Sequence, residues 1–299
     1  MKKENKKSKI IIVSLILLII LLITILSLFL NIKSKEKVKF YLIRIEGPIM
    51  TSGDFYFYKI TNADEILKEI EKAKNYDGIL LYINSNGGSA SASFKILDAL
   101  KEYKSMNKTI IAFIDEAGLS GAYLIASVAD KIYANRISLI GSIGVIGSYL
   151  EIAGLLERYN ISYVRIVKGD YKDIGSPLKH ITEKEKEILE KKIEIIYNEF
   201  IEEVSKNRKL DKEEVKKIAN GEFFISNEAL ELKLIDKIGN MKDIKNDIEK
   251  ELNKSLEIIE VRKPSSFYEE LKKIISFSFY AIGYGIGNSI KNYNPNIEL

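Results

Sequence analysis

One serine of the sequence stands where a nucleophile could be exposed. The stretch AGLSGAY, residues 117–123, places Ser120 among small residues, after an apolar β-rich run and before an apolar helical pattern. A strand, a glycine turn and a helix that begins at the hydroxyl are typical of a serine nucleophile. The same arrangement also suits a serine that caps a helix. The stretch alone therefore leaves both interpretations open.

A serine hydroxyl attacks only when a base removes its proton, and histidine is the usual base. His180 is the single histidine and lies in a polar stretch. A buried lysine can also accept a proton near neutral pH, because burial disfavours its charged form. Lys172 lies in the loop KGDYKDIGSP, residues 168–177, after a strand candidate. Composition alone does not select Lys172 over Lys168 or Lys179.

A glycine pair at the end of another apolar run could stabilise an oxyanion. The sequence INSNGGSASAS, residues 83–93, completes the apolar run GILLYIN. Glycines there let the backbone approach a substrate closely and present N–H groups to developing negative charge. Any turn from a strand to a helix can contain such a pair, so the pair indicates a site only in combination with other motifs.

Composition excludes several kinds of site. The 299 residues contain no cysteine and one histidine, so disulfides, thiol nucleophiles, thiolate metal sites and multi-histidine metal sites are impossible. The formal charge is +4, but residues 1–39 hold nine lysines and two glutamates, a net +7, which leaves −3 for residues 40–299. The basic excess belongs to the N-terminus and does not indicate a nucleic-acid surface. We expect no cofactor, no metal and no nucleic-acid partner.

The N-terminal region predicts a membrane anchor. Residues 10–30 carry no charge and would form a helix roughly 30 Å long, about the thickness of the hydrocarbon core of a bilayer. No small-x-small site ends this run, which favours an uncleaved anchor over a signal peptide. We expect a basic cytoplasmic tail at 1–9, a transmembrane signal anchor at 10–32 and a juxtamembrane linker at 33–38. The rest of the chain should then lie on the extracytoplasmic face of the cell membrane.

The elements that must position the candidate residues alternate between strands and helices, which predicts an α/β domain with a mainly parallel sheet at 39–260. Thr182 and Glu185 have the spacing of a capping box at the start of a long helix. Strands are expected at 38–47, 78–84, 109–115, 162–167 and 234–238, and helices at 63–76, 92–103, 120–129, 182–206, 211–219, 226–232 and 241–253.

The final segment, residues 261–299, is apolar or amphipathic. It has no charge from Ile274 to Ile286, but it contains glycines and is too short to predict a second membrane span. It could lie on the membrane, pack between subunits or dock as an ordinary helix. The sequence does not choose among these roles.

Four segments occur in an order that is found in one enzyme family. The sequence has NSNGG at 84–88, LSGAY at 119–123, IGSIGV at 140–145 and KDIGSP at 172–177. Together they resemble the signal peptide peptidases of the serine–lysine type, in the single-domain short form of the protease IV-like family. That family has Asn-Ser-Pro-Gly-Gly, Ser-Gly-Gly-Tyr-Tyr, Thr-Gly-Ser-Leu-Gly-Val and Lys-Asp-x-x-Ser-Pro in the same order. The resemblance covers most of the chain after the apolar N-terminal run.

The resemblance implies a role for each matching residue. Ser120 would be the nucleophile and Lys172 its general base, and Ser142 would orient the lysine. Gly88 would donate its backbone N–H to the oxyanion, with Gly121 as a second donor. It also implies a crotonase-like, Clp protease-like fold and a homo-oligomer whose active sites combine residues of neighbouring subunits.

Three positions depart from the family pattern. Asn86 stands in place of the proline, Ser89 where a third glycine is common, and Ala122 in place of the second glycine after the nucleophile. The first two put the rigidity of the glycine loop in doubt. None of the three removes a reacting group.

The resemblance implies a membrane-anchored serine endopeptidase that works through an acyl-enzyme. Its substrates would be remnant signal peptides and other hydrophobic or unfolded polypeptides. Three alternatives stay open: a related protease with a specific membrane-protein substrate, a catalytically inactive membrane scaffold, and a crotonase-type acyl-CoA enzyme. The presence of both Ser120 and Lys172 favours a peptidase over the last two.

Overall fold

A computed structural model describes residues 4–30, 36–52, 59–261 and 267–293. The chain divides into two units, residues 1–259 and 260–299. The second unit contains one long helix, α10, Phe267–Tyr293. The first unit contains the α/β domain and all of the candidate site residues.

The α/β domain is built on an eight-stranded sheet. Its strands are β1 Lys37–Glu46, β4 Gly78–Ser85, β5 Thr109–Leu119, β6 Lys131–Ala134, β7 Leu139–Gly141, β8 Phe223–Ile225, β9 Lys237–Ile238 and β10 Ser255–Ile259. The order along the main path is β10-β1-β4-β5-β6-β9, and β7 pairs with both β5 and β8. Every pairing is parallel except that of β7 with β8. The mainly parallel α/β fold predicted from the sequence is confirmed.

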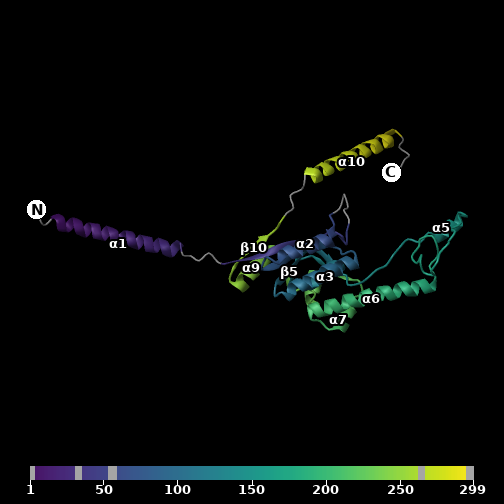
Figure 1. Cartoon of the computed structure of the whole chain (residues 1–299), viewed down its shortest axis with the longest axis horizontal. Coiled ribbons are helices and arrows are strands. Elements are labelled where there is room, and N and C mark those ends of the chain that lie inside the picture. Colours follow the sequence, from purple (N-terminus) through teal and green to yellow (C-terminus); the bar gives the residue numbers. More distant parts are fainter. Residues whose placement is uncertain (1–3, 31–35, 53–58, 262–266, 294–299) are drawn as a thin grey trace. The chain divides into compact units, whose positions relative to one another are not determined.

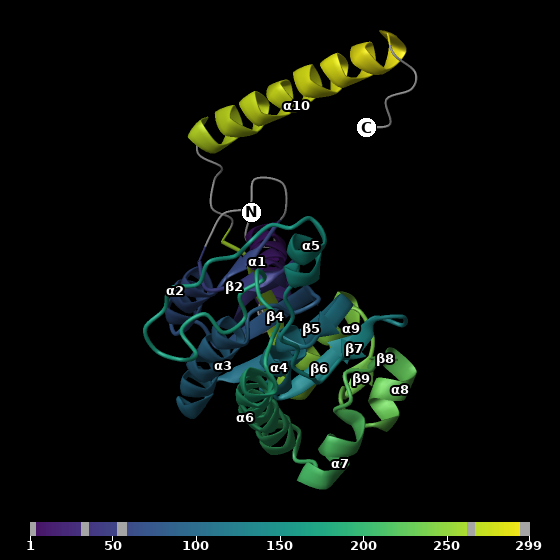
Figure 2. The same ribbon diagram turned by 90° about the vertical axis from the view of Figure 1, so that its right-hand side faces the viewer.

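Helices cover both faces of this sheet, as Figure 2 shows for the face behind α2, α3 and α4. The helices are α2 Ala63–Ala73, α3 Ala90–Ser105, α4 Gly121–Ser127, α6 Glu183–Arg208, α7 Lys212–Ile218, α8 Ser226–Glu231 and α9 Met241–Leu252. A separate pair of short parallel strands, β2 Ile49–Met50 and β3 Thr61–Asn62, precedes α2.

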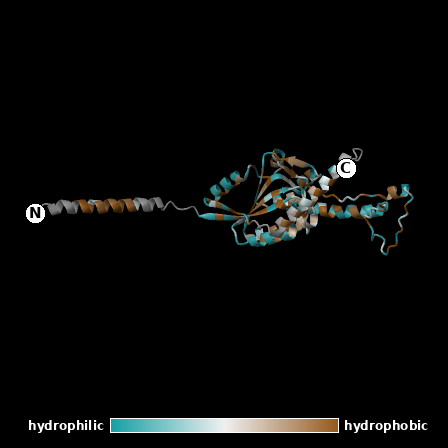
Figure 3. Ribbon diagram, turned by 90° about the horizontal axis from the view of Figure 1, so that it is seen from above, coloured by the Kyte–Doolittle hydropathy of each residue, from teal (hydrophilic) through white to brown (hydrophobic). Residues whose placement is uncertain are grey.

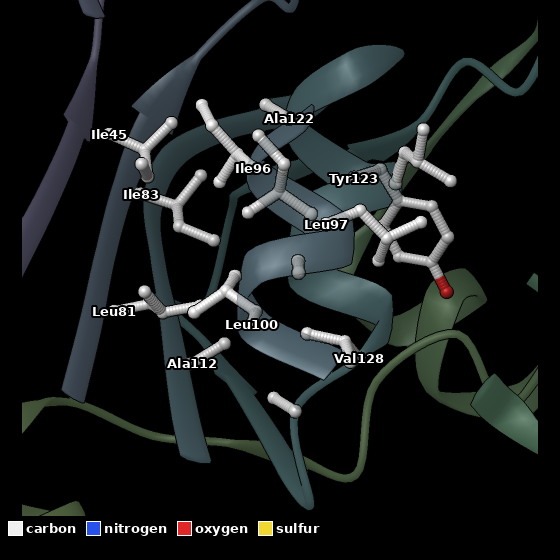
Figure 4. Close-up of a cluster of buried hydrophobic side chains, with 14 of the residues drawn as sticks. Ile45, Leu81, Ile83, Ile96, Leu97, Leu100, Ala112, Ala122, Tyr123 and Val128 are labelled. Atoms are coloured by element: carbon white, nitrogen blue, oxygen red, sulfur yellow. The ribbon is translucent and has the colours of Figure 1, made fainter. Parts of the chain in front are cut away.

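The alternation of side chains along β4 explains the two-sided core. Ile83 and Leu81 face α3 and pack in one cluster with Leu97, as Figure 4 shows. Leu80 points to the other face and packs with Ile244 of α9. Successive residues of a strand point to opposite faces, so a strand that is covered on both faces is apolar at nearly every position.

Most of the elements expected from the sequence are present, and one is not. The expected capping box is confirmed at the start of α6, where Thr182 and Glu185 exchange hydrogen bonds between side chain and backbone. The strand expected at 162–167 is wrong, because these residues have no regular secondary structure. Val164 and Ile166 are 77% and 95% exposed, and in the described part of the chain no strand lies beside them. An alternating pattern forms a strand only where a partner strand completes the backbone hydrogen bonds.

Residues 147–182, which we call the arm, leave the sheet after β7 and return at the start of α6. The arm contains one short helix, α5 Ala153–Arg158, and is otherwise irregular. Figure 1 shows α5 beyond the end of α6 that lies away from the sheet. The other end of α6 packs into the core through Phe200, Ile201 and Val204. The arm is therefore attached to the domain along α6.

Residues 10–30 of the predicted membrane anchor lie in helix α1, Glu4–Leu30, and its last two residues, 31 and 32, lie outside the described residues. Figure 3 shows apolar residues along the described part of this helix. Where side chains are described, no helix is both long enough and apolar enough to cross a membrane. The transmembrane segment therefore stays a prediction. Parts of the predicted tail and linker, residues 1–3 and 33–35, lie outside the described residues.

Candidate active site

Ser120 occupies a strained turn between β5 and α4. Its φ and ψ are 51° and −124°, in a region that non-glycine residues rarely adopt. Its backbone N–H donates to the carbonyl of Gly141 at 2.8 Å, and its own carbonyl accepts from Leu124 at 3.0 Å. The side chain makes no capping hydrogen bond, although Ser120 is the N-cap residue of α4. The structure thus does not support the helix-capping interpretation. The hydroxyl is not used by the backbone of α4 and is available to react.

The glycine loop after β4 is fixed by β2. Ile49 donates its N–H to Gly87 at 2.9 Å and accepts from the N–H of Ser89 at 2.8 Å. A Cβ added to Gly88 would lie 2.2 Å from the carbonyl oxygen of Ile49, so no other residue fits there without moving the loop. Asn86, in place of the family's proline, put the rigidity of this loop in doubt. The hydrogen bonds with Ile49 of β2 hold the loop instead.

Two backbone N–H groups border the space in front of Ser120. Among the described residues, the N–H of Gly88 has no hydrogen-bond acceptor. The nitrogen of Gly88 lies 3.7 Å from the point where a Cβ on Gly121 would be. The nitrogen of Gly121 lies 2.9 Å from the point where a Cβ on Gly87 would be, so the glycine loop and the start of α4 are in close contact. Fixed amide donors beside a nucleophile can stabilise the oxyanion of a tetrahedral intermediate without reorganising.

A cavity of about 650 Å³ opens at Ser120, Gly88 and Gly121. Its large apolar lining side chains include Phe94, Leu124, Val145, Ile146, Ile196 and Phe200. A cleft with apolar walls and a few convergent polar groups suits a short stretch of peptide with apolar side chains. In the described ranges, no cluster of three or more histidine, aspartate or glutamate side chains could hold a metal ion.

Ser142 lines the same cavity as Ser120. Its φ is 47°, and its backbone N–H donates to the carbonyl of Glu222 at 2.9 Å. Its hydroxyl donates to the carbonyl of Gly221 at 3.1 Å. The structure thus brings four of the predicted site residues together around one cavity: Ser120, Ser142, Gly88 and Gly121.

Lys172 is not brought to this cavity within one chain. It lies in the arm with its side chain exposed, and it does not line the cavity. Its backbone N–H donates to Gly169 at 3.1 Å, which forms part of a turn. A dyad of Ser120 and Lys172 would therefore need a lysine from another copy of the chain or a rearrangement of the arm.

His180 also lies in the arm, and its ring is held by two carboxylates. Its Nδ1 lies 2.7 Å from Oε1 of Glu151, and its Nε2 lies 3.4 Å from Oε1 of Glu157. The hydrogen bond with Glu151, followed by that with Glu157, raises the pKa of His180 above its usual range. His180 does not line the Ser120 cavity. The structure therefore does not position it as the base for Ser120.

Sequence reasoning missed Ser93, a buried residue of α3 that also lines the cavity. Its hydroxyl donates to the carbonyl of Ser89 at 3.0 Å. The same oxygen lies 2.2 Å from where a Cβ of Gly121 would be, so Ser93 occupies the space that a side chain at position 121 would need. The sequence signal that could have indicated Ser93 is its position four residues after Ser89, in the first turn of a predicted helix.

Residues 102–255 match the sequence profile of peptidase family S49, and this range includes Ser120, Ser142 and Lys172. A putative protease of Methanocaldococcus jannaschii is 34% identical over 78% of this chain and 76% of its own length. The chain belongs to family S49. A putative signal peptide peptidase SppA of Enterococcus faecium is also 34% identical, over 71% of this chain and 63% of its own length. The chloroplastic serine protease SPPA of Arabidopsis thaliana is 27% identical, over 83% of this chain and 35% of its own length.

Membership of family S49 identifies the protein as a serine endopeptidase that resembles the signal peptide peptidases. The resemblance stated from four sequence motifs is thereby confirmed. The family match does not assign the individual site residues. Their roles follow from the geometry around Ser120 and are part of the proposal that comes next.

Proposed function

We propose that this S49 peptidase is a membrane-anchored endopeptidase with a Ser/Lys dyad that degrades remnant signal peptides and other hydrophobic or unfolded polypeptides. The observation that carries the proposal is the strained Ser120, whose hydroxyl makes no capping hydrogen bond. It lies at a partly apolar cavity beside the N–H of Gly88, which has no acceptor in the described part of the chain. The parallel sheet with α3 and α4 behind this site is consistent with the crotonase-like fold that the resemblance implies.

The proposed reaction is an acyl transfer in two halves. Oγ of Ser120 forms a bond to the carbonyl carbon of the substrate, and its proton passes to Nζ of Lys172. The N–H groups of Gly88 and Gly121 stabilise the negative oxygen of the intermediate. The carbon–nitrogen bond then breaks, and the leaving amine takes the proton from Lys172. Water repeats these steps on the ester of Ser120 and releases the new carboxylate.

A second copy of the chain supplies Lys172 in this proposal. One chain provides Ser120, Ser142 and the oxyanion donors but leaves Lys172 outside the cavity. The arm that carries Lys172 also exposes apolar side chains that an assembly would cover. The most exposed of them are Leu150, Tyr159, Val164 and Ile166. We therefore infer a homo-oligomer in which the arm of one subunit reaches the cavity of its neighbour.

The substrate class follows from the cavity and the N-terminal sequence. The cavity is lined by aliphatic and aromatic side chains, which suit the apolar core of a signal peptide. The uncharged run at 10–30 would hold the enzyme in the bilayer where such peptides remain after processing. Tethering raises the effective concentration of enzyme and substrate for each other. The relative from Enterococcus faecium is itself named a putative signal peptide peptidase.

Mixing two inactive variants tests the shared dyad. Full-length Ser120→Ala and Lys172→Ala proteins are purified in detergent, and cleavage of a synthetic signal peptide is measured for each alone and for the mixture after subunit exchange. We expect partial recovery, because Ser120 of one variant would meet Lys172 of the other. Mixed oligomers that form and stay inactive would place both residues of the dyad in one subunit.

Labelling and accessibility test the remaining parts of the proposal. A fluorophosphonate probe should label Ser120 in the wild type and not in Ser120→Ala, whereas an inactive scaffold would not be labelled. Protease added to spheroplasts should digest residues 40–299 if the domain is extracytoplasmic. Protection of the domain until lysis would reverse the topology. Cleavage of one membrane protein but not of signal peptides would favour the specific-protease alternative.

A further inference from the structure

The loop that presents Lys172 is held by a chain of ion pairs in the arm. Arg165 binds both carboxylate oxygens of Asp173 through Nε and Nη2, with the Nη2 bond at 2.8 Å. The same Nη2 also donates to the backbone carbonyl of Asp170 at 3.1 Å. Arg165 therefore joins the two sides of the turn that contains Lys172. A bidentate arginine–carboxylate pair fixes the direction of both groups more strongly than a single contact does.

This arrangement continues from Asp173 to the start of α6. Nζ of Lys179 lies 3.9 Å from Asp173 and forms a closer ion pair with Glu185. Glu185 is 4% exposed in its side chain and accepts hydrogen bonds from the N–H and hydroxyl of Thr182, both at 3.0 Å. The turn around Lys172 is thus connected to a capped helix whose far end is packed in the core of the domain.

The charges around Lys172 offset one another. The groups that face or flank this turn are Lys168, Asp170 and Asp173 from the loop, Arg165 from the preceding stretch, Lys179 from the following turn, and Glu185 from α6. Three of them are positive and three are negative. The hydrogen bond from Arg165 also holds the pKa of Asp173 below its usual range, so this carboxylate stays charged and paired.

We propose that Arg165 and Asp173 act as positioning residues that orient Lys172 and keep the adjacent carboxylate from stabilising its ammonium form. A nearby carboxylate without a partner favours the charged form of a lysine, and a charged lysine cannot accept the proton of serine. Asp173 is next to Lys172 in sequence, so its pairing with Arg165 reduces this effect. The inference rests on the proposed function, in which Lys172 is the base.

The test compares the pH dependence of kcat/KM for full-length variants on one peptide substrate. Arg165→Ala removes the bidentate partner of Asp173 and leaves only the longer ion pair with Lys179 at 3.9 Å, so the acid limb of the profile should move to higher pH by about one unit. Asp173→Asn leaves Arg165 unpaired, so the limb should move to lower pH. In the double variant both charges are removed, so the acid limb should return close to that of the wild type. We expect kcat to be low in both single variants and in the double variant, because each of them loses the orientation of Lys172. KM should change little, because neither residue lines the cavity.

Arg158→Ala is the matched control, because Arg158 is an exposed arginine of the same arm. It should leave both the limb and kcat unchanged. Arg165→Lys keeps the charge and gives a second variant if Arg165→Ala does not fold, and it should keep the limb but lose about tenfold in kcat.

Two outcomes separate this inference from the proposed function. If the acid limb moves in the same direction for Arg165→Ala and Asp173→Asn, or does not move in either variant, the positioning role of Arg165 and Asp173 is overturned. An inactive Lys172→Ala protein would still support the dyad in that case. An active Lys172→Ala protein would overturn the proposed function itself, whatever the other variants do. Sedimentation of each variant checks that the oligomer is unchanged.

Discussion

The surroundings of Ser120 and the arm that carries Lys172 are built in different ways. Helix α4 behind Ser120 is buried throughout, from Gly121 to Ser127, and the glycine loop beside it is paired with β2. The arm has little regular secondary structure and leaves Val164 and Ile166 exposed to solvent. Buried packing holds the first region, whereas ion pairs from Arg165 to Asp173 and from Lys179 to Glu185 hold the second.

This difference explains why one chain can build the serine side of the proposed site by itself but not the lysine side. Ser120 and Ser142 adopt positive φ values that cost about 1–3 kcal/mol each, and such strain persists only where the surroundings fix the backbone. The core of the domain meets that condition. Lys172 in the arm has no such strained backbone. The apolar side chains of the arm are exposed, and a partner surface would cover them. The nucleophile thus belongs to the buried part of the domain and the proposed base to the exposed arm.

The largest effect should come from removing the nucleophile. Ser120→Ala should lower kcat by a factor on the order of 10⁶, the size found when a serine nucleophile is removed from another protease. The melting temperature should hardly change, because the hydroxyl makes no capping hydrogen bond that the alanine would lose. Peptide cleavage and a thermal melt measure the two quantities. Residual activity above one hundredth of wild type would assign the nucleophile elsewhere.

The next effect concerns the arm. Lys172→Ala and Lys172→Arg should each lower kcat by about 10²–10⁴, because a general base contributes that much and an arginine stays protonated. Both variants should remain folded, since Lys172 is exposed. Lys168→Ala is the control, because this lysine lies four residues earlier in the same arm. Equal losses in Lys168→Ala and Lys172→Ala would show that the arm acts through its overall charge.

The sequence predicted the rigid part of the molecule better than the arm. The strands from Gly78 and Thr109 are apolar runs buried on both faces, and local pattern determines them. The stretch 162–167 also has a strand-like pattern, an alternating one, but no strand lies beside it among the described residues. The motifs that contain Ser120 and Gly88 could be found because glycines and a strained turn leave a local signature. The position of Lys172 could not, because it depends on contacts between distant segments and, as proposed, between chains.

A clash at the oxyanion loop should have an intermediate effect. In Gly88→Ala the added Cβ would lie 2.2 Å from the carbonyl oxygen of Ile49, so the loop must move and its N–H would leave the oxyanion position. We expect kcat to fall by about 10²–10³ with a smaller change in KM. Steady-state kinetics on a peptide substrate measure both. Gly169→Ala is a control of similar backbone strain in the arm, where a Cβ would meet nothing within 4 Å.

A smaller and repairable loss is expected at Gly121. Its added Cβ would lie 2.2 Å from Oγ and 3.0 Å from Cβ of Ser93. Gly121→Ala should therefore lower the free energy of unfolding by about 1–3 kcal/mol and reduce activity. Adding Ser93→Gly removes both close contacts and should restore most of the activity. The single Ser93→Gly variant measures the cost of the new glycine. A double variant no better than Gly121→Ala would mean that the position requires glycine for another reason.

The smallest effect should come from His180, the histidine alternative to Lys172 as the base. Its ring is 58% exposed and lies between Glu151 and Glu157, whose hydrogen bonds raise its pKa. A raised pKa means that the folded protein holds the proton more tightly than the unfolded chain. The resulting stability is fully present below the unfolded value of about 6.5 and is lost as pH rises through the folded value.

His180→Ala should therefore lower the melting temperature slightly at pH 5 and not at pH 9, and at pH 8 it should keep most of the cleavage activity. Thermal melts at both pH values and one activity assay are sufficient. Gln in place of His180 is the control for size, because it can still form a hydrogen bond but never carries charge. If His180→Ala abolished cleavage while Lys172→Ala retained it, the base would lie between Glu151 and Glu157, and the serine–lysine dyad would be excluded. If both variants retained cleavage, neither Lys172 nor His180 would be the base, and the same assay on Lys168→Ala and Lys179→Ala would decide whether the arm supplies one at all.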